Sequence, residues 1–172
     1  MILNAIIHNE YHHAETWQEM SAVIDEIMTN LRYETFNNPW TDPGETVCLM
    51  FDKAPFTGKP APWPDNTLCV SVNASTGYGG LTWYVEDERA AREQSDITEH
   101  IWVSDNPNPP AFDPRVVSES HYPLFYDPRC TLPAALIRSA LEEFCRTGTG
   151  DRPTCVDWTR GHINGQLLDA VW

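Results

Sequence analysis

Apolar residues recur at helical spacing in two segments of the chain. Thr16 and Glu19 have the spacing of a capping box, in which each side chain accepts a hydrogen bond from the other residue's backbone N–H. The apolar positions behind this cap are Trp17, Met20, Ile24, Ile27, Met28 and Leu31. They predict a one-sided helix that covers an apolar surface. A second helix is predicted over residues 132–146, because Pro133 stands in its first turn and Gly148 follows its end.

Short apolar runs predict the strands of a sheet around these helices. The expected strands are residues 2–7, 46–51, 68–72, 81–85, 99–104, 155–159 and 166–169. The polar residues 87–96 join two of these strands as a long hairpin loop or a short helix. Asn164-Gly165 predicts a tight turn before the last strand, with both residues at positive φ.

The order of these elements defines the expected fold class. Strands and helices do not alternate strictly, which disfavours a doubly wound parallel sheet. We therefore predict one α+β domain over residues 1–172, with an antiparallel or mixed sheet that carries the N-terminal and the C-terminal helix on one face. Residues 104–131 hold six prolines and little periodicity. Such a long irregular stretch inside a compact domain is often functional.

The charge of the chain narrows the classes of partner. The 172 residues carry a formal net charge of −14, with 25 acidic and 11 basic side chains. Nucleic-acid binding needs cations that displace the counterions of phosphates, and membrane-surface binding needs basic residues, so we expect neither partner. A strongly negative surface instead favours attraction to basic proteins.

Targeting signals and cysteines bear on the compartment. The longest apolar run is the five residues 47–51, and the first residues have no basic segment, so we expect neither a membrane span nor a signal sequence. The five cysteines, Cys48, Cys69, Cys130, Cys145 and Cys155, form no C-x-x-C pair. This usage predicts reduced, mostly buried thiols in the cytoplasm.

Motifs for catalysis and metal binding are weak. His8, His12 and His13 cluster in an expected loop, but no second pair of ligands follows at metal-binding spacing. We therefore expect no metal, no other cofactor and no catalytic residues. One enzymatic alternative remains open, namely a small hydrolase or thiol enzyme that uses Cys130 or Cys145 with His121 or His162. A structural subunit of a larger complex is another alternative, since the sequence leaves the oligomeric state undetermined.

A surface for protein binding is the better-supported site. Trp83 and Tyr84 are strand neighbours whose side chains point to opposite faces of the sheet, so one of them faces away from the main core. Buried aromatic anchors beside acidic groups suit the recognition of a basic protein. The predicted partner-facing residues are Trp83, Glu86, Asp87, Glu88, Asp105 and Asp127.

Several ordered blocks resemble a known family. They are Gly77–Tyr84, Ile101–Arg115, Tyr126–Arg129, Leu132–Pro153, Trp158 and Asn164-Gly165. Across roughly residues 68–169, these blocks resemble an actinobacterial branch of the first numbered family of immunity proteins in bacterial polymorphic toxin systems. The resemblance implies a non-catalytic cytoplasmic inhibitor, encoded beside a secreted toxin, that binds the toxin's catalytic domain. It also implies a toxin of the nucleic-acid deaminase class, whose cleft must admit a polynucleotide and is therefore expected to be electropositive.

Overall fold

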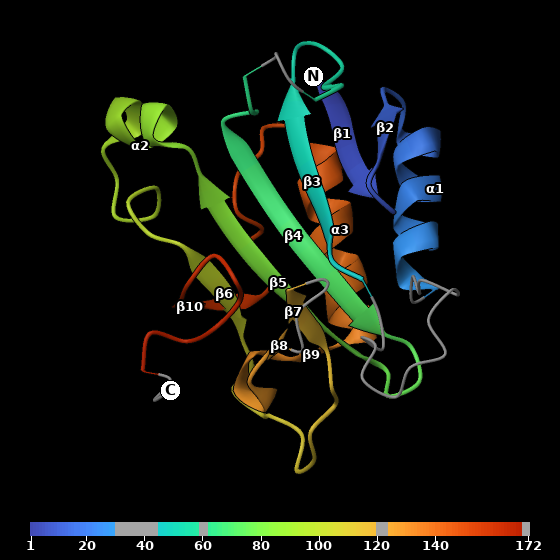
Figure 1. Cartoon of the computed structure of the whole chain (residues 1–172), viewed down its shortest axis with the longest axis vertical. Helices are drawn as coiled ribbons and strands as arrows, with labels where there is room; N and C mark the ends of the chain where they lie inside the picture. The colour runs from blue at the N-terminus through green and yellow to red at the C-terminus, as the bar shows by residue number, and fades with distance from the viewer. Residues whose placement is uncertain (30–44, 59–61, 120–123, 170–172) are drawn as a thin grey trace.

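A single antiparallel sheet forms the centre of the protein, in a computed structural model that describes residues 1–29, 45–58, 62–119 and 124–169 (Figure 1). Its strand order is β10-β6-β5-β4-β3-β1-β2, with β9 pairing to β5. The strands are β1 (Ile2–Ile7), β2 (Glu10–Ala14), β3 (Val47–Asp52), β4 (Asn66–Asn73), β5 (Tyr78–Val85), β6 (Trp102–Asp105), β9 (Leu132–Pro133) and β10 (Asp157–Arg160). The helices are α1 (Trp17–Met28), α2 (Asp87–Glu93) and α3 (Ala134–Thr147). The predicted α+β class is thus confirmed.

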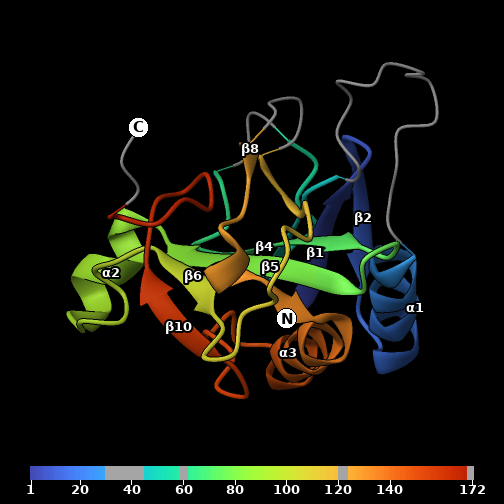
Figure 2. The same cartoon turned by 90° about the horizontal axis from the view of Figure 1, so that it is seen from below.

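The two faces of the sheet carry different layers. Along β5, Leu81 and Trp83 join the main core with residues of α1 and α3, and Figure 2 shows both helices below the sheet. The alternate residue Thr82 faces the other side, where its hydroxyl lies 2.9 Å from the Tyr126 hydroxyl. That side is covered in part by β7 (Val117–Glu119), β8 (Leu124–Phe125) and the short 3₁₀ helix η1 (Pro128–Cys130).

Local signals located the two long helices well. The predicted capping box of α1 is present, with the Thr16 side chain accepting from the Glu19 backbone and Glu19 accepting from the Thr16 backbone. Leu31, predicted at the end of this helix, lies outside the described residues. Helix α3 begins at Ala134 instead of at 132, because the two preceding residues pair with β5 as β9.

Other predictions need correction. Strand β2 was expected to be part of a loop, but it pairs with β1 through a turn in which His8 and Asn9 both have positive φ. The irregular stretch 104–131 contains β7, β8 and η1. At the last turn, Gly165 has positive φ and Asn164 does not, and the expected strand 166–169 is reduced to one bridge between Gly161 and Leu167.

The cysteines divide into three environments. Cys48 and Cys69 face each other across β3 and β4 and form a disulfide, so the prediction of reduced thiols is wrong for this pair. The sequence did not predict this disulfide, because the two cysteines are 21 residues apart and meet only through the register of β3 and β4. Cys130 and Cys145 are buried free thiols, as expected, whereas Cys155 is exposed.

Asn66 replaces a missing backbone pair where β3 and β4 diverge. The backbone register of these strands ends at Leu49 and Leu68. Further along, the Asn66 side chain accepts a hydrogen bond from the Phe51 N–H at 2.9 Å and donates one to the Phe51 carbonyl at 2.8 Å. The side chain therefore satisfies both buried backbone groups of Phe51, at the end of the sheet from which α2 departs.

We expect Asn66→Ala to lower the free energy of unfolding by about 2–4 kcal/mol, because it leaves a buried donor and a buried acceptor unpaired. Urea denaturation measures this loss. Asn108→Ala is the matched control, since this asparagine is exposed and its change should cost less than about 0.5 kcal/mol. Equal midpoints for the two variants would contradict the assigned role of Asn66.

Candidate functional site

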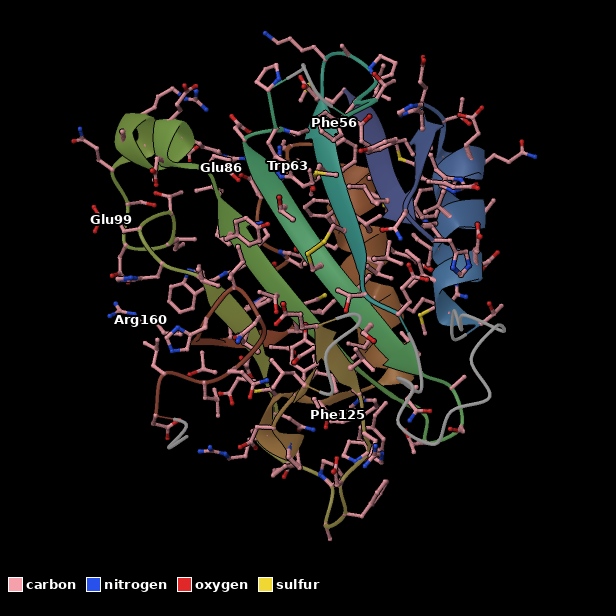
Figure 3. All side chains as sticks on the ribbon, in the orientation of Figure 1. Phe56, Trp63, Glu86, Glu99, Phe125 and Arg160 are labelled. Atoms are coloured by element: carbon pink, nitrogen blue, oxygen red, sulfur yellow. A yellow bond between two sulfur atoms is a disulfide. The ribbon has the colours of Figure 1, made fainter. Side chains whose placement is uncertain are left out.

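The predicted partner-facing acids fall into two groups. Glu86 is the half-buried residue at the N-cap position of α2, where its side chain makes no capping hydrogen bond, and Asp87 and Glu88 are exposed in the first turn. Asp105 ends β6 and Asp127 precedes η1, both half-buried. Figure 3 places Glu86 near α2 at the upper left, whereas Phe125, two residues before Asp127, lies in the lower part of the view. The structure therefore brings Glu86, Asp87 and Glu88 together and separates them from Asp105 and Asp127.

Trp83 is almost completely buried. Its side chain is 1% exposed within the main core, and its Nε1–H donates to the Gly150 carbonyl at 3.0 Å. Trp83, which was predicted to face a partner, therefore offers almost no exposed surface and borders only the cavity described below. Period-two alternation correctly placed the two neighbouring aromatic residues on opposite faces, but the residue that faces away from the main core is Tyr84, which is half-buried.

Arg89 attaches the acidic helix to the rest of the molecule. It is the buried residue of α2, with 7% of its side chain exposed, and its Nε–H donates to Glu93 at 2.7 Å. Its other nitrogens donate to the Thr149 carbonyl at 3.2 Å and to the Asp151 carboxylate. Burial by itself lowers the pKa of Arg89, but the contacts with Glu93, Asp151 and Asp65 outweigh burial and raise that pKa. Arg89 thus links α2 to the segment that follows α3.

A cavity of about 500 Å³ lies between the two segments that Arg89 joins. One side consists of Arg89, Glu93, Ser95, Ile97 and Thr98, and the other consists of residues 151–154 and 156–158. Trp83 also lines the cavity, from the sheet. Its volume lies within the range of 300–1,000 Å³ that is typical of ligand pockets. The acidic turn of α2 therefore stands next to an open pocket with charged walls.

In the second acidic group, Asp127 is paired with an arginine. Asp127 accepts hydrogen bonds from the backbone N–H and the guanidinium of Arg129, and this pairing lowers the pKa of Asp127 despite partial burial. Asp105 lines a smaller cavity of about 270 Å³ together with Arg129 and Arg160. A carboxylate that already has an arginine beside it attracts a distant basic partner less strongly than an unpaired one does.

The geometry disfavours the thiol-enzyme alternative. Burial raises the pKa of Cys130 and of Cys145 to about 12, so both thiols are protonated at neutral pH. Burial and a hydrogen bond with Glu143 likewise raise the pKa of Cys155 to about 12. His162 is exposed and His121 lies outside the described residues.

The histidine cluster does not form a site either. His8 pairs with Glu45 at 2.6 Å, and the His13 ring lies 2.9 Å from the Asn4 side-chain oxygen. His12 and His13 are strand neighbours and therefore point to opposite faces. Across residues 1–29, 45–58, 62–119 and 124–169, no three His, Cys, Asp or Glu side chains gather in a way that could hold a metal ion. In the same residues, no helix combines the length and apolar character needed to cross a membrane.

The fold and the site together define a small antiparallel α+β protein that presents an acidic helix beside an open, charged pocket. A family model, described as immunity protein Imm1, matches residues 8–160 of the chain. The chain therefore belongs to the Imm1 immunity protein family, as the sequence blocks suggested. The match also includes β2 and α1, which those blocks did not cover. Searches of curated proteins and of solved structures found no match.

Membership in this family suggests a protein that neutralises a cognate toxin protein by binding it, without an enzymatic activity of its own.

The sequence by itself did not identify the residues that shape the site, which are Arg89, Asp151 and Arg152. Arg89 stands inside an acidic segment and Asp151-Arg152 inside a turn-like one, so no spacing pattern connects them. The contact between α2 and the segment after α3 is long-range, and a conserved pairing across aligned relatives is the kind of signal that finds such contacts.

We expect Arg89→Met to release α2. The change keeps the apolar stem but removes every hydrogen bond of the guanidinium, so the free energy of unfolding should fall by about 2–3 kcal/mol. Amide hydrogen exchange over residues 87–93 should accelerate at least about tenfold. Arg92→Met is the matched control, because this neighbouring arginine is exposed and pairs with Asp65 at the surface. Unchanged exchange in the Arg89 variant would show that another contact holds the helix.

Alkylation tests the thiol environments. At pH 7.5, iodoacetamide should leave Cys130 and Cys145 unmodified in the folded protein, because both are buried and protonated. Cys155 should react slowly, and Glu143→Gln should accelerate its reaction severalfold by removing the carboxylate that raises its pKa. Glu142→Gln is the control at the adjacent helix position. Peptide mass spectrometry measures each site, and rapid modification of Cys130 or Cys145 would restore the thiol-enzyme alternative.

Proposed function

We propose that this protein neutralises a secreted toxin by docking its acidic α2 face on the toxin's catalytic domain and blocking access of the substrate. The observation that carries the proposal is the family match over residues 8–160. The binding surface of the proposal consists of Glu86, Asp87 and Glu88, with the adjoining rim of the 500 Å³ cavity.

The state of the α2 carboxylates supports their role. Among the described residues, neither Glu86 nor Asp87 nor Glu88 takes part in an ion pair, whereas Glu93 at the other end of the helix pairs with Arg89. Unpaired carboxylates keep their full charge available to a partner. Two of the three lie in the first turn of a helix, where the helix dipole stabilises negative charge. The acidic turn is therefore stable as it stands and needs no rearrangement to meet a basic surface.

The proposed target is a toxin of the nucleic-acid deaminase class. Such an enzyme must hold a polynucleotide, and its cleft therefore requires positive charge along the path of the phosphates. A protein with a net charge of −14 and an unpaired acidic turn is complementary to a cleft of this kind. Opposite potentials accelerate the encounter of two proteins and decide between partners more than they add to affinity.

Inhibition in this proposal requires binding alone. A stable complex buries on the order of 1,600 Å², which is enough to cover a catalytic cleft. We propose that docking takes place in the cytoplasm of the producing cell, where the toxin would otherwise reach its substrate. Asp105 remains a second, separate contact of the proposal, and Asp127, whose charge Arg129 balances, contributes less.

We expect the triple variant Glu86→Gln, Asp87→Asn, Glu88→Gln to associate with the toxin about 10-fold more slowly at low salt, because it removes the unpaired charge that attracts a basic cleft. The partner is the C-terminal domain of the secreted protein encoded beside this chain. Stopped-flow mixing at two ionic strengths measures the rate, and the wild-type protein should lose more of its rate with added salt than the variant does.

The matched control is Glu10→Gln, Glu15→Gln, Glu26→Gln. It changes the net charge by the same amount on β2, on α1 and on the short connection between them, away from the proposed surface. Its association rate should stay within about twofold of wild type. If both triple variants slow association equally, the overall charge attracts the toxin and α2 has no special role. If the α2 variant behaves like wild type, its acidic turn is not the docking surface.

A further inference from the structure

Arg152 occupies an unusual position in the 500 Å³ cavity. The carbon at the centre of its guanidinium lies 4.2 Å from the centre of the Trp102 ring and 5.8 Å from that of the Trp158 ring. Both indoles are fixed, since Trp102 Nε1–H donates to the Ile97 carbonyl and Trp158 Nε1–H to the Pro153 carbonyl. The guanidinium therefore rests against two anchored aromatic rings, which hold it in place through cation–π contacts.

The guanidinium of Arg152 lacks an acceptor among the residues that the structure describes. Its Nη1 is fully buried without a hydrogen-bond partner, and none of the ion pairs of the described chain includes this residue. The neighbouring Arg89 and Arg160 each bind a carboxylate. Arg152 is half-buried, and burial lowers its pKa, yet an arginine stays charged in a protein. A shielded, unpaired charge is costly unless a partner supplies the opposite charge.

Two of the chain's acids near Arg152 already have partners of their own. Asp96, the acid whose charge acts on Arg152, already accepts from Arg160 at 2.7 Å and lies 3.3 Å from His100. Asp151 already pairs with Arg89, which lies on the opposite wall of the cavity from Arg152. A group that enters the cavity therefore meets no ion pair of Arg152 that it would have to displace.

We propose that this pocket receives a single aspartate or glutamate side chain of the bound toxin, which pairs with Arg152; this inference rests on the proposed function. The planar guanidinium fork matches the two oxygens of a carboxylate. Glu93, Asp151 and Asp157 also line the cavity, and their charges disfavour a doubly charged phosphate more than a singly charged carboxylate. The fork thus favours a carboxylate by its shape, and the acidic lining favours a singly charged anion over a doubly charged one.

The acids of α2 and the Arg152 pocket would then have different effects on binding. The exposed acids of α2 accelerate the encounter, whereas a carboxylate buried against Arg152 fixes the register of the complex and slows its dissociation. A toxin without an acid at the matching position would leave Arg152 unpaired and shielded in the complex. That cost makes the pocket a determinant of which toxin the protein neutralises.

A blocked amino acid tests the pocket without the toxin. The probe is N-acetyl-glutamate α-methylamide, and its control is the uncharged N-acetyl-glutamine methylamide. In ¹⁵N-labelled protein, we expect the glutamate probe to shift the indole N–H signals of Trp102 and Trp158 in a saturable way, with at least about 10-fold higher affinity than the glutamine probe. Inorganic phosphate is the third ligand. Equal shifts with both amino-acid probes, or stronger binding of phosphate, would overturn the proposal.

Variants tie the signal to Arg152. Arg152→Gln should abolish the glutamate response, and Arg152→Lys, which keeps the charge but loses the fork, should weaken it at least about fivefold. Arg146→Gln is the matched control, because Arg146 also stacks on a tryptophan, Trp17, but on an exposed site far from the cavity. If Arg152→Gln does not fold, the lysine variant decides the question. Full glutamate affinity in either folded variant would overturn the proposal.

The toxin complex separates this inference from the proposed function. With the toxin domain encoded beside the chain, Arg152→Gln should raise the dissociation rate at least about 10-fold and change the association rate less than about twofold. Unchanged dissociation of a complex that does form would refute the role of the pocket and leave the proposed function intact. Failure of the wild-type protein to form any complex would refute the proposed function, while the glutamate titration would still decide what the pocket binds.

Discussion

The position of the acidic face depends on the hydrogen bonds of one buried side chain, Arg89. A helix as short as α2, with its seven residues, is not stable in water by itself, and its buried residue is this arginine. The guanidinium binds Glu93 within the helix and Thr149 and Asp151 beyond it. These contacts tie the start of the β5–β6 connection to the segment after α3, which is far away in the sequence. Asp87 and Glu88 are exposed beside the arginine that is held inward.

The same contact creates the cavity beside the helix. Arg89 holds α2 and the 149–151 segment together. The residues that follow α2 and the residues that follow this segment therefore face one another across a cavity of about 500 Å³. Arg152 then lies one residue past the acid that Arg89 binds, against two anchored indoles. The site therefore combines unpaired negative charge on an exposed helix with unpaired positive charge in a shielded pocket. An arrangement of this kind suits recognition of a protein surface whose own charges alternate in sign.

How much the sequence predicted depended on the range of the interaction. The Thr16–Glu19 capping box and the strand around Leu81 follow from neighbouring residues, and they form where expected. Strand β2 was missed because His8-Asn9 is a less recognisable turn than Asn-Gly, although both residues adopt positive φ. The Cys48–Cys69 disulfide depends on the register of two strands, which no local pattern fixes.

The candidate site was predictable in its charge and not in its shape. The cluster of Glu86, Asp87 and Glu88 is contiguous in the sequence, so its exposure on one turn could be anticipated. The sequence did not decide between Trp83 and Tyr84, because alternation shows that two neighbours point in opposite directions without showing which direction is inward. That choice depends on α3 and on the Gly150 carbonyl that Trp83 binds, both distant in the sequence.

The central claim is that this member of the Imm1 family acts through the face formed by α2 and the segment after α3. Hydrogen–deuterium exchange of the protein, with and without the catalytic domain of its proposed cognate toxin, tests this claim most directly. The account predicts protection of residues 86–98 and 149–158 in the complex. Protection confined to α1 and the exposed side of α3, with residues 86–98 exchanging as in the free protein, would contradict it.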